Sequence, residues 1–114
     1  MELSILGETL TRKSSDTTKY YGFWMPRGGD QASFGIEIIR LSASGFQVFV
    51  ETKNADQADS AATTLGSAQA PTTTGITKWT VSGAKEWVRY VIEPTGANTP
   101  ILQFQFLAPQ WAPN

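Results

Sequence analysis

The stretch FGIEIIRLSASGFQVFVE, Phe34–Glu51, decides the fold of this chain. Two runs rich in aromatic and β-branched residues, Phe34–Leu41 and Phe46–Glu51, flank the polar segment Ser42–Gly45, which ends in glycine. Such runs favour β-strands, and a short polar connection that contains glycine is typical of a hairpin turn. The stretch therefore predicts a central β-hairpin.

The two predicted strands are apolar on one face and partly apolar on the other, because strand side chains alternate between faces. The apolar face carries Phe34, Ile36 and Ile38 in the first run and Phe46, Val48 and Val50 in the second. The opposite face mixes polar residues with Ile39, Leu41 and Phe49, and a β-bulge would exchange the two faces beyond it. One domain core covers one face of a strand, so the second apolar face needs a separate explanation.

The rest of the chain predicts further short strands separated by turns of Gly, Pro, Asn and Ser residues. The predicted ranges are Leu3–Lys13 with a bulge after Gly7, Lys19–Pro26, Thr63–Gly66 as an edge strand, Ile76–Val81, Trp87–Glu93 and Ile101–Leu107. The tail Ala108–Asn114 is too rich in proline for a strand ladder. Seven or eight short strands without an amphipathic helix predict that residues 1–114 form a single all-β domain, an antiparallel β-sandwich or jelly roll.

Composition excludes several classes of partner. The chain has nine basic and ten acidic residues and no basic run, whereas binding to a phosphate backbone needs clustered Lys and Arg, so we expect no nucleic-acid partner. No apolar run approaches the roughly 20 residues of a membrane helix, so we expect no membrane partner. The start, Met1–Glu8, lacks the basic and apolar regions of a signal peptide, so none is expected.

The chain contains neither cysteine nor histidine, which restricts its chemistry. Thiolate catalysis and zinc–thiolate sites are excluded, and the commonest general base is missing. Glu37, Glu51, Glu86 and Glu93 are the candidates for a carboxylate pair of the glycosidase kind, but no spacing brings two of them together. We therefore expect a protein that is not an enzyme, with no catalytic residues and no cofactor.

One polar segment raises the question of calcium. Glu51, Asn54, Asp56 and Asp59 offer oxygen ligands at short spacings, which is the ligand type that Ca²⁺ prefers. The segment lacks the glycine and the terminal glutamate of a helical calcium loop. A solvated polar loop is the preferred interpretation, so no metal site is predicted, and calcium binding by Asn54–Asp59 stays open.

The two-faced strands predict an interface between proteins, because large exposed apolar patches mark interaction sites. The predicted contact residues are Tyr21, Phe23, Ile39, Phe49 and Trp87, with Trp111 on a tail that reaches a neighbour. Burial of one such side chain contributes about 1.5–3 kcal/mol, so several together favour a homo-oligomer. The charged fraction of 17%, below the usual value of about 25%, also fits a surface covered by a partner.

The aromatic residues allow an alternative function. Exposed Trp and Tyr rings form platforms on which sugar rings stack, and the candidates here are Trp24, Trp79, Trp87, Trp111, Tyr20 and Tyr21. A carbohydrate-binding β-sandwich module would need an open groove lined by one or two of these rings. An assembly protein would instead need its second apolar faces in contacts with protein.

The runs Phe46–Asp56, Thr63–Ser67 and Trp87–Tyr90 resemble small β-sandwich virion proteins of tailed phages, a group that includes capsid decoration (cement) proteins. The resemblance implies a non-enzymatic structural protein that sits on a capsid lattice, as an oligomer, and stabilises the shell. It implies that the partners are further copies of the chain and a capsid or other virion protein. It also implies synthesis in the host cytoplasm and location in the virion.

Overall fold

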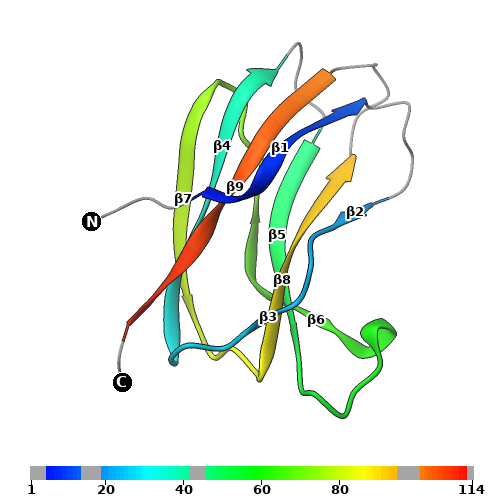
Figure 1. Cartoon of the computed structure of the whole chain (residues 1–114), viewed down its shortest axis with the longest axis vertical. Coiled ribbons are helices and arrows are strands. Elements are labelled where there is room, and N and C mark those ends of the chain that lie inside the picture. Colours follow the sequence, from blue (N-terminus) through cyan, green and yellow to red (C-terminus); the bar gives the residue numbers. More distant parts are fainter. Residues whose placement is uncertain (1–4, 14–18, 42–45, 95–100, 113–114) are drawn as a thin grey trace.

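The aromatic and β-branched runs of the sequence lie in two antiparallel sheets packed face to face (Figure 1). The structure, a computed structural model, describes residues 5–13, 19–41, 46–94 and 101–112. The strands are β1 (Ile5–Lys13), β2 (Tyr20–Tyr21), β3 (Met25–Pro26), β4 (Gln31–Leu41), β5 (Phe46–Lys53), β6 (Thr63–Gln69), β7 (Gly75–Ser82), β8 (Trp87–Pro94) and β9 (Ile101–Ala112). A 3₁₀ turn, η1 (Asp59–Ala61), lies between β5 and β6. The predicted all-β antiparallel sandwich is confirmed.

The strand order is that of a long hairpin rolled into two layers. One sheet has the order β1-β9-β4-β7, and the other has the order β2-β8-β5-β6 with β3 also paired to β8. β1 pairs with β9, β2 and β3 with β8, β4 with β7, and β5 with β6, so the bend of the hairpin is the β5–β6 connection. The roll adds the pairs β4–β9 and β5–β8 and produces a jelly roll.

The predicted hairpin over Phe34–Glu51 is wrong in its pairing. β4 pairs with β7 and β9, whereas β5 pairs with β6 and β8, so the two runs lie in opposite sheets. The predicted turn Ser42–Gly45 lies outside the described residues. The pattern was ambiguous because two strands that are each apolar on one face can bury it by facing one another across a core. Both are interior strands, so the stretch is central as predicted.

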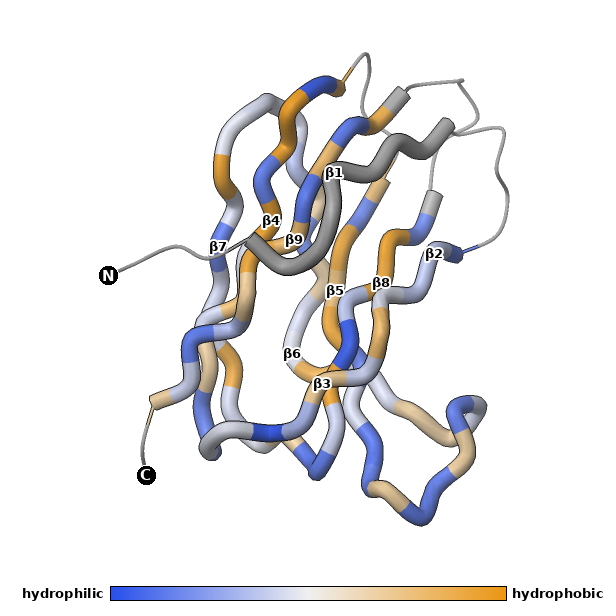
Figure 2. Tube along the Cα trace, viewed as in Figure 1, coloured by the Kyte–Doolittle hydropathy of each residue, from blue (hydrophilic) through white to orange (hydrophobic). Residues whose placement is uncertain are grey.

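The core lies between the sheets and is built mainly from the inward-facing residues of β4, β5, β8 and β9. The largest inward side chains that are almost fully buried are Phe34, Ile36, Val48, Val50, Val88, Tyr90, Ile92, Leu102 and Phe104. Rings meet across the layers, with Tyr90 stacked on Phe106 at 4.4 Å between centroids. Figure 2 shows the hydrophobic stretches along β5 and β8. No helix within the described ranges is long and apolar enough to span a membrane.

Strand β9 continues through Pro109, which corrects the prediction that the proline-rich tail forms no ladder. Ser33 lies opposite Gln110 and Gly35 lies opposite Leu107, so β9 contains one more residue than β4 at this point. Such a bulge interrupts the ladder and accommodates a residue that has no N–H to donate. The tail therefore continues the sheet as far as Ala112.

Bulges also turn Trp111 and Leu41 toward the core, whereas the sequence pattern placed both residues outside it. Beyond the β9 bulge the ring of Trp111 lies 6.0 Å from that of Phe34, measured between centroids. In β4 the register shifts between Ile38 and Arg40, and Leu41 packs against the core. Trp111 and Leu41 are thus partly buried against the core of their own chain.

The hydroxyl of Tyr90 joins the two layers at the β9 bulge. It accepts a hydrogen bond from the Gly35 N–H at 2.9 Å and donates one to the Leu107 carbonyl at 2.7 Å. Burial raises the pKa of this phenol, although the hydrogen bond from Gly35 opposes the shift. The Tyr90 side chain of one sheet therefore forms the hydrogen bonds that the bulge leaves unmade between Gly35 and Leu107 of the other sheet.

Candidate binding surface

The outer face of β5 and β8 carries the side chains that the core leaves out. The outward residues pair across the two strands as Phe49 with Val91, Glu51 with Arg89, and Lys53 with Trp87. Phe49 and Val91 are only 5% and 0% exposed, although they face away from the core. Phe49 and Val91 therefore form an apolar part of this outer face that other residues of the same chain bury.

A bulge in the neighbouring segment brings Trp24 to the same face. Between Tyr21 and Met25 the β2–β3 segment advances by four residues while β8 advances by three. Met25 is buried in the core, whereas Tyr21 is 46% exposed on the outer side. In an unbroken strand Tyr21 and Met25 would lie on the same face, and the extra residue places them on opposite faces.

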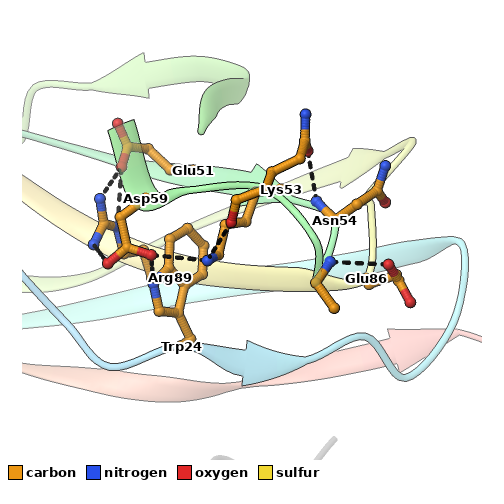
Figure 3. A network of polar contacts seen from close by, with 9 residues as sticks. Trp24, Glu51, Lys53, Asn54, Asp59, Glu86 and Arg89 are labelled. Atoms are coloured by element: carbon orange, nitrogen blue, oxygen red, sulfur yellow. Dashed lines mark hydrogen bonds and ion pairs between the residues drawn. The ribbon is translucent and has the colours of Figure 1, made fainter. Parts of the chain in front are cut away.

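Arg89 is the centre of this surface (Figure 3). Its guanidinium lies 4.1 Å from the ring centroid of Tyr21 and 4.3 Å from that of Trp24. Its Nε and Nη2 donate hydrogen bonds to Glu51 Oε1 at 3.0 and 2.8 Å. The side chains of Arg89 and Glu51 are 11% and 13% exposed, so this charged pair is largely shielded from water.

Asp59 of η1 reaches across the same cluster (Figure 3). Its Oδ1 accepts hydrogen bonds from Lys53 Nζ at 2.8 Å and from Trp24 Nε1 at 3.1 Å, and its Oδ2 lies 3.9 Å from Arg89 Nη1. The hydrogen bond from Lys53 is the main reason that the pKa of Asp59 is lowered, and the Trp24 bond and the two positive charges add to it. This carboxylate thereby ties the β5–β6 connection to the sheet.

We call this set the aromatic–arginine cluster, and its members are Tyr21, Trp24, Glu51, Lys53, Asp59 and Arg89. Two open depressions flank it. One, of about 330 Å³, is lined by Trp24, Lys53, Ala55 and Trp87. The other, of about 480 Å³, is lined by Lys19, Tyr21, Glu51, Asp59, Ser60, Ala62 and Arg89. Aromatic and charged side chains of both signs lie together here, which suits recognition of a partner with mixed polarity.

The predicted contact residues differ in what covers them. Tyr21, Phe23 and Ile39 are exposed, with Phe23 at 60%, and Trp87 is half-buried. Phe49 is covered by its own chain, and the Lys19 ammonium lies 5.7 Å from the centre of its ring. The single sandwich therefore does not leave Phe49 uncovered. Trp111 does not lie on an extended tail either, because its ring packs against that of Phe34.

Two of the carboxylates considered as calcium ligands, those of Glu51 and Asp59, are in other contacts. Glu51 is paired with Arg89, and Asp59 is paired with Lys53 at 2.8 Å. Among the described residues no three His, Cys, Asp or Glu side chains are grouped so that they could hold a metal ion. Calcium binding at this segment remains untested.

The glutamates considered for catalysis lie in separate contacts. Glu37 accepts a hydrogen bond from Gln105, Glu93 from Gln47, and Glu86 from the Ala55 N–H. Glu37 lies on the outer face of the first sheet, whereas Glu51 lies on that of the second. The arrangement instead brings Glu51 and Asp59 together around Arg89, with Lys53 beside Asp59.

Sequence reasoning did not identify the aromatic–arginine cluster. Trp24 was considered as a sugar platform and Asp59 as a calcium ligand, while Arg89 was not singled out. The cluster depends on the β2–β3 bulge and on the path of the β5–β6 connection, and neither feature leaves a periodic signal. The usable signal was the cross-strand pair of opposite charges, Glu51 and Arg89, inside two apolar strands.

Comparison of the chain with protein-family models, with curated proteins and with solved structures found no match. Its function is therefore inferred from the chemistry of its surfaces.

Proposed function

We propose that this chain is a non-enzymatic assembly protein, a capsid decoration (cement) protein or another virion surface protein. It binds the shell through the outer face of β2, β5 and β8. The observation that carries the proposal is the aromatic–arginine cluster, in which the ring of Tyr21 is exposed, together with the exposed ring of Phe23 in the same β2–β3 segment. Protein interfaces are enriched in aromatic residues and arginine, and these residues supply most binding hot spots.

The cluster is ordered before any partner arrives, which favours binding. Arg89 is held by Glu51 and by two aromatic rings, so little side-chain freedom is left to lose on association. Asp59 remains 62% exposed and presents a carboxylate at the rim of the face. A partner surface with aromatic groups and hydrogen-bond donors fits this arrangement.

The depression lined by Trp24 and Trp87 favours a second candidate, a carbohydrate-binding module. Sugar rings stack on open aromatic faces. Here the Lys53 ammonium lies 4.9 Å from the centre of the Trp24 ring, and the Arg89 guanidinium lies 4.3 Å from it. A sugar would have to compete with these cations for Trp24, so the assembly function is the better supported of the two.

The proposal requires that the gene belongs to a phage, and mass spectrometry of the purified particles of that phage tests it. We expect the chain in amounts comparable to those of the major shell protein, and its absence from intact particles would contradict the proposal. A glycan array distinguishes the second candidate. Sugar binding that is lost in a folded Trp87→Ala variant would replace the assembly function by carbohydrate recognition.

A further inference from the structure

The carboxylate of Asp59 lies against three donor groups that the sheet holds in place (Figure 3). Its Oδ1 accepts hydrogen bonds from Lys53 Nζ at the end of β5 and from Trp24 Nε1 of the β2–β3 segment, at 2.8 and 3.1 Å. Its Oδ2 lies 3.9 Å from Nη1 of Arg89 in β8. Two cations and an indole N–H on one side of a carboxylate have the chemistry of a carboxylate-binding site.

The two cations of this site need an anion besides Glu51. The side chains of Lys53 and Arg89 are only 12% and 11% exposed. Glu51 is paired with Arg89 at 2.8 Å, so it balances one of the two charges, and Asp59 balances the other. A shielded cation without its anion is costly. The site therefore favours a new anion when Asp59 leaves it.

The connection that carries Asp59 is attached to the sheet through polar contacts. No residue between Thr52 and Leu65 is buried, and this whole stretch lies within the described residues. Besides the contacts of Asp59, the Ala55 N–H donates a hydrogen bond to Glu86 at 2.9 Å. Segments that bury little and are attached by exposed polar groups open at a low cost in free energy. Asp59 can therefore leave while the three donors stay in place on the sheet.

We propose that these three donors form a binding site for an acidic side chain of another protein, and that Asp59 occupies this site in the free chain. The open depression lined by Asp59, Ser60 and Arg89 gives access to it. Because Asp59 belongs to the same chain, its effective concentration is high, and a ligand that replaces it needs contacts beyond its carboxylate. A protein segment supplies them, and Tyr21, which is 46% exposed, lines the same depression.

The site belongs to the aromatic–arginine cluster, but the inference does not need the chain to be a virion protein. Its test uses the purified chain alone, so a failure of the proposed function leaves it standing, and its own failure leaves the proposed function standing.

Removal of the Asp59 carboxylate opens the site to a free carboxylate. We expect sodium acetate to shift the Trp24 indole N–H signal of Asp59→Ala in NMR spectra saturably, toward its position in the unmodified chain, because acetate restores the acceptor. Sodium chloride at the same ionic strength should not. The unmodified chain and the matched control Asp56→Ala, altered at an exposed position of the same connection, keep Asp59 and should bind acetate roughly tenfold more weakly or less.

The contribution of the ammonium is tested in the same background. Lys53→Met added to Asp59→Ala keeps an unbranched apolar side chain and removes the charge, so acetate binding should weaken by roughly tenfold. Asp59→Ser replaces Asp59→Ala if circular dichroism shows that the latter does not fold. The proposal is overturned by a folded variant without the Asp59 carboxylate that binds acetate no better than Asp56→Ala, or by equal binding with and without the Lys53 ammonium.

Two blocked tripeptides distinguish an acidic side chain from a small free carboxylate. Acetyl-Gly-Asp-Gly-amide carries one carboxylate, and acetyl-Gly-Asn-Gly-amide carries none. We expect Asp59→Ala to bind the first roughly tenfold more tightly than the second. Acetate binding without a preference for the peptide that contains Asp would restrict the site to free small carboxylates and overturn its assignment to an acidic side chain of a protein.

Discussion

The two outer faces of the sandwich are built differently. On the outer face of β4, β7 and β9 small polar side chains bond in pairs, as Ser33 does with Thr80 at 3.0 Å. On the outer face of β5 and β8, Phe49 is buried, and the Arg89–Glu51 pair lies under aromatic rings. One face is an ordinary solvated sheet, and the other is the base of an additional packed layer.

The difference shows that an apolar residue on the outer face of a strand does not by itself require a second protein. Phe49 and Ile39 look alike in the alternating pattern, yet Phe49 is covered by its own chain and Ile39 is exposed. Exposure in the folded chain is the better guide to a partner, and Tyr21 in the aromatic–arginine cluster and Phe23 two residues further along the chain are both exposed.

The largest expected effect is the difference in stability between a variant of one outer face and a variant of the other. Phe49→Ala should lower the free energy of unfolding by about 3–5 kcal/mol, because it removes a buried ring and leaves a cavity. Ile76→Ala, on the outer face of the other sheet, should cost less than about 1 kcal/mol, because Ile76 is exposed. Urea denaturation measures both. Equal and small losses would mean that Phe49 is not covered in solution.

A smaller effect is expected from the charged pair. Arg89→Ala should lower the free energy of unfolding by about 2–3 kcal/mol, because Glu51 would then be shielded from water without its cation. Ser33→Ala, which removes a polar pair on the opposite face, should change it by about 0.5 kcal/mol. Thermal and urea unfolding of the two variants would contradict this view if Ser33→Ala were the more damaging.

The smallest effect concerns the contact of Asp59 with the sheet. Because the pKa of this carboxyl is lowered in the folded chain, its contribution is complete above its ordinary value of 3.8 and is lost as the pH falls below it. The Trp24 indole N–H signal in NMR spectra should therefore shift with a midpoint below 3.8, and the shift should be absent in Asp59→Asn. A midpoint above 3.8 would contradict the ion-pair geometry.

Alternation of side chains was enough to predict the strands and the sandwich, because the inward sets of β4, β5 and β8 follow the two-residue period. A bulge in β1 was also predicted, from Gly7, and the register shift between Leu6 and Leu10 agrees with it. Pairing could not be predicted, since the pattern around Phe34–Glu51 is equally satisfied within one sheet or across two.

The candidate site was less predictable than the fold. The two-faced strand predicts that Tyr21 and Phe23 are contact residues; both are exposed, and their contacts with a partner stay a prediction. The position of Trp24 depends on one inserted residue in the β2–β3 segment, and that of Asp59 depends on the β5–β6 connection. Single insertions and loop paths alter which side chains meet without altering the local composition.

The most direct test of the binding face compares one exposed apolar residue on each side of the sandwich. Phe23→Asp and Ile76→Asp introduce the same charge at positions that are 60% and 45% exposed, so neither should unfold the chain. Cosedimentation with purified capsids measures the proposed binding to a shell. Phe23→Asp is expected to weaken binding at least tenfold while Ile76→Asp binds normally, whereas equal binding by both variants, or loss only in Ile76→Asp, would contradict the assignment of the binding face.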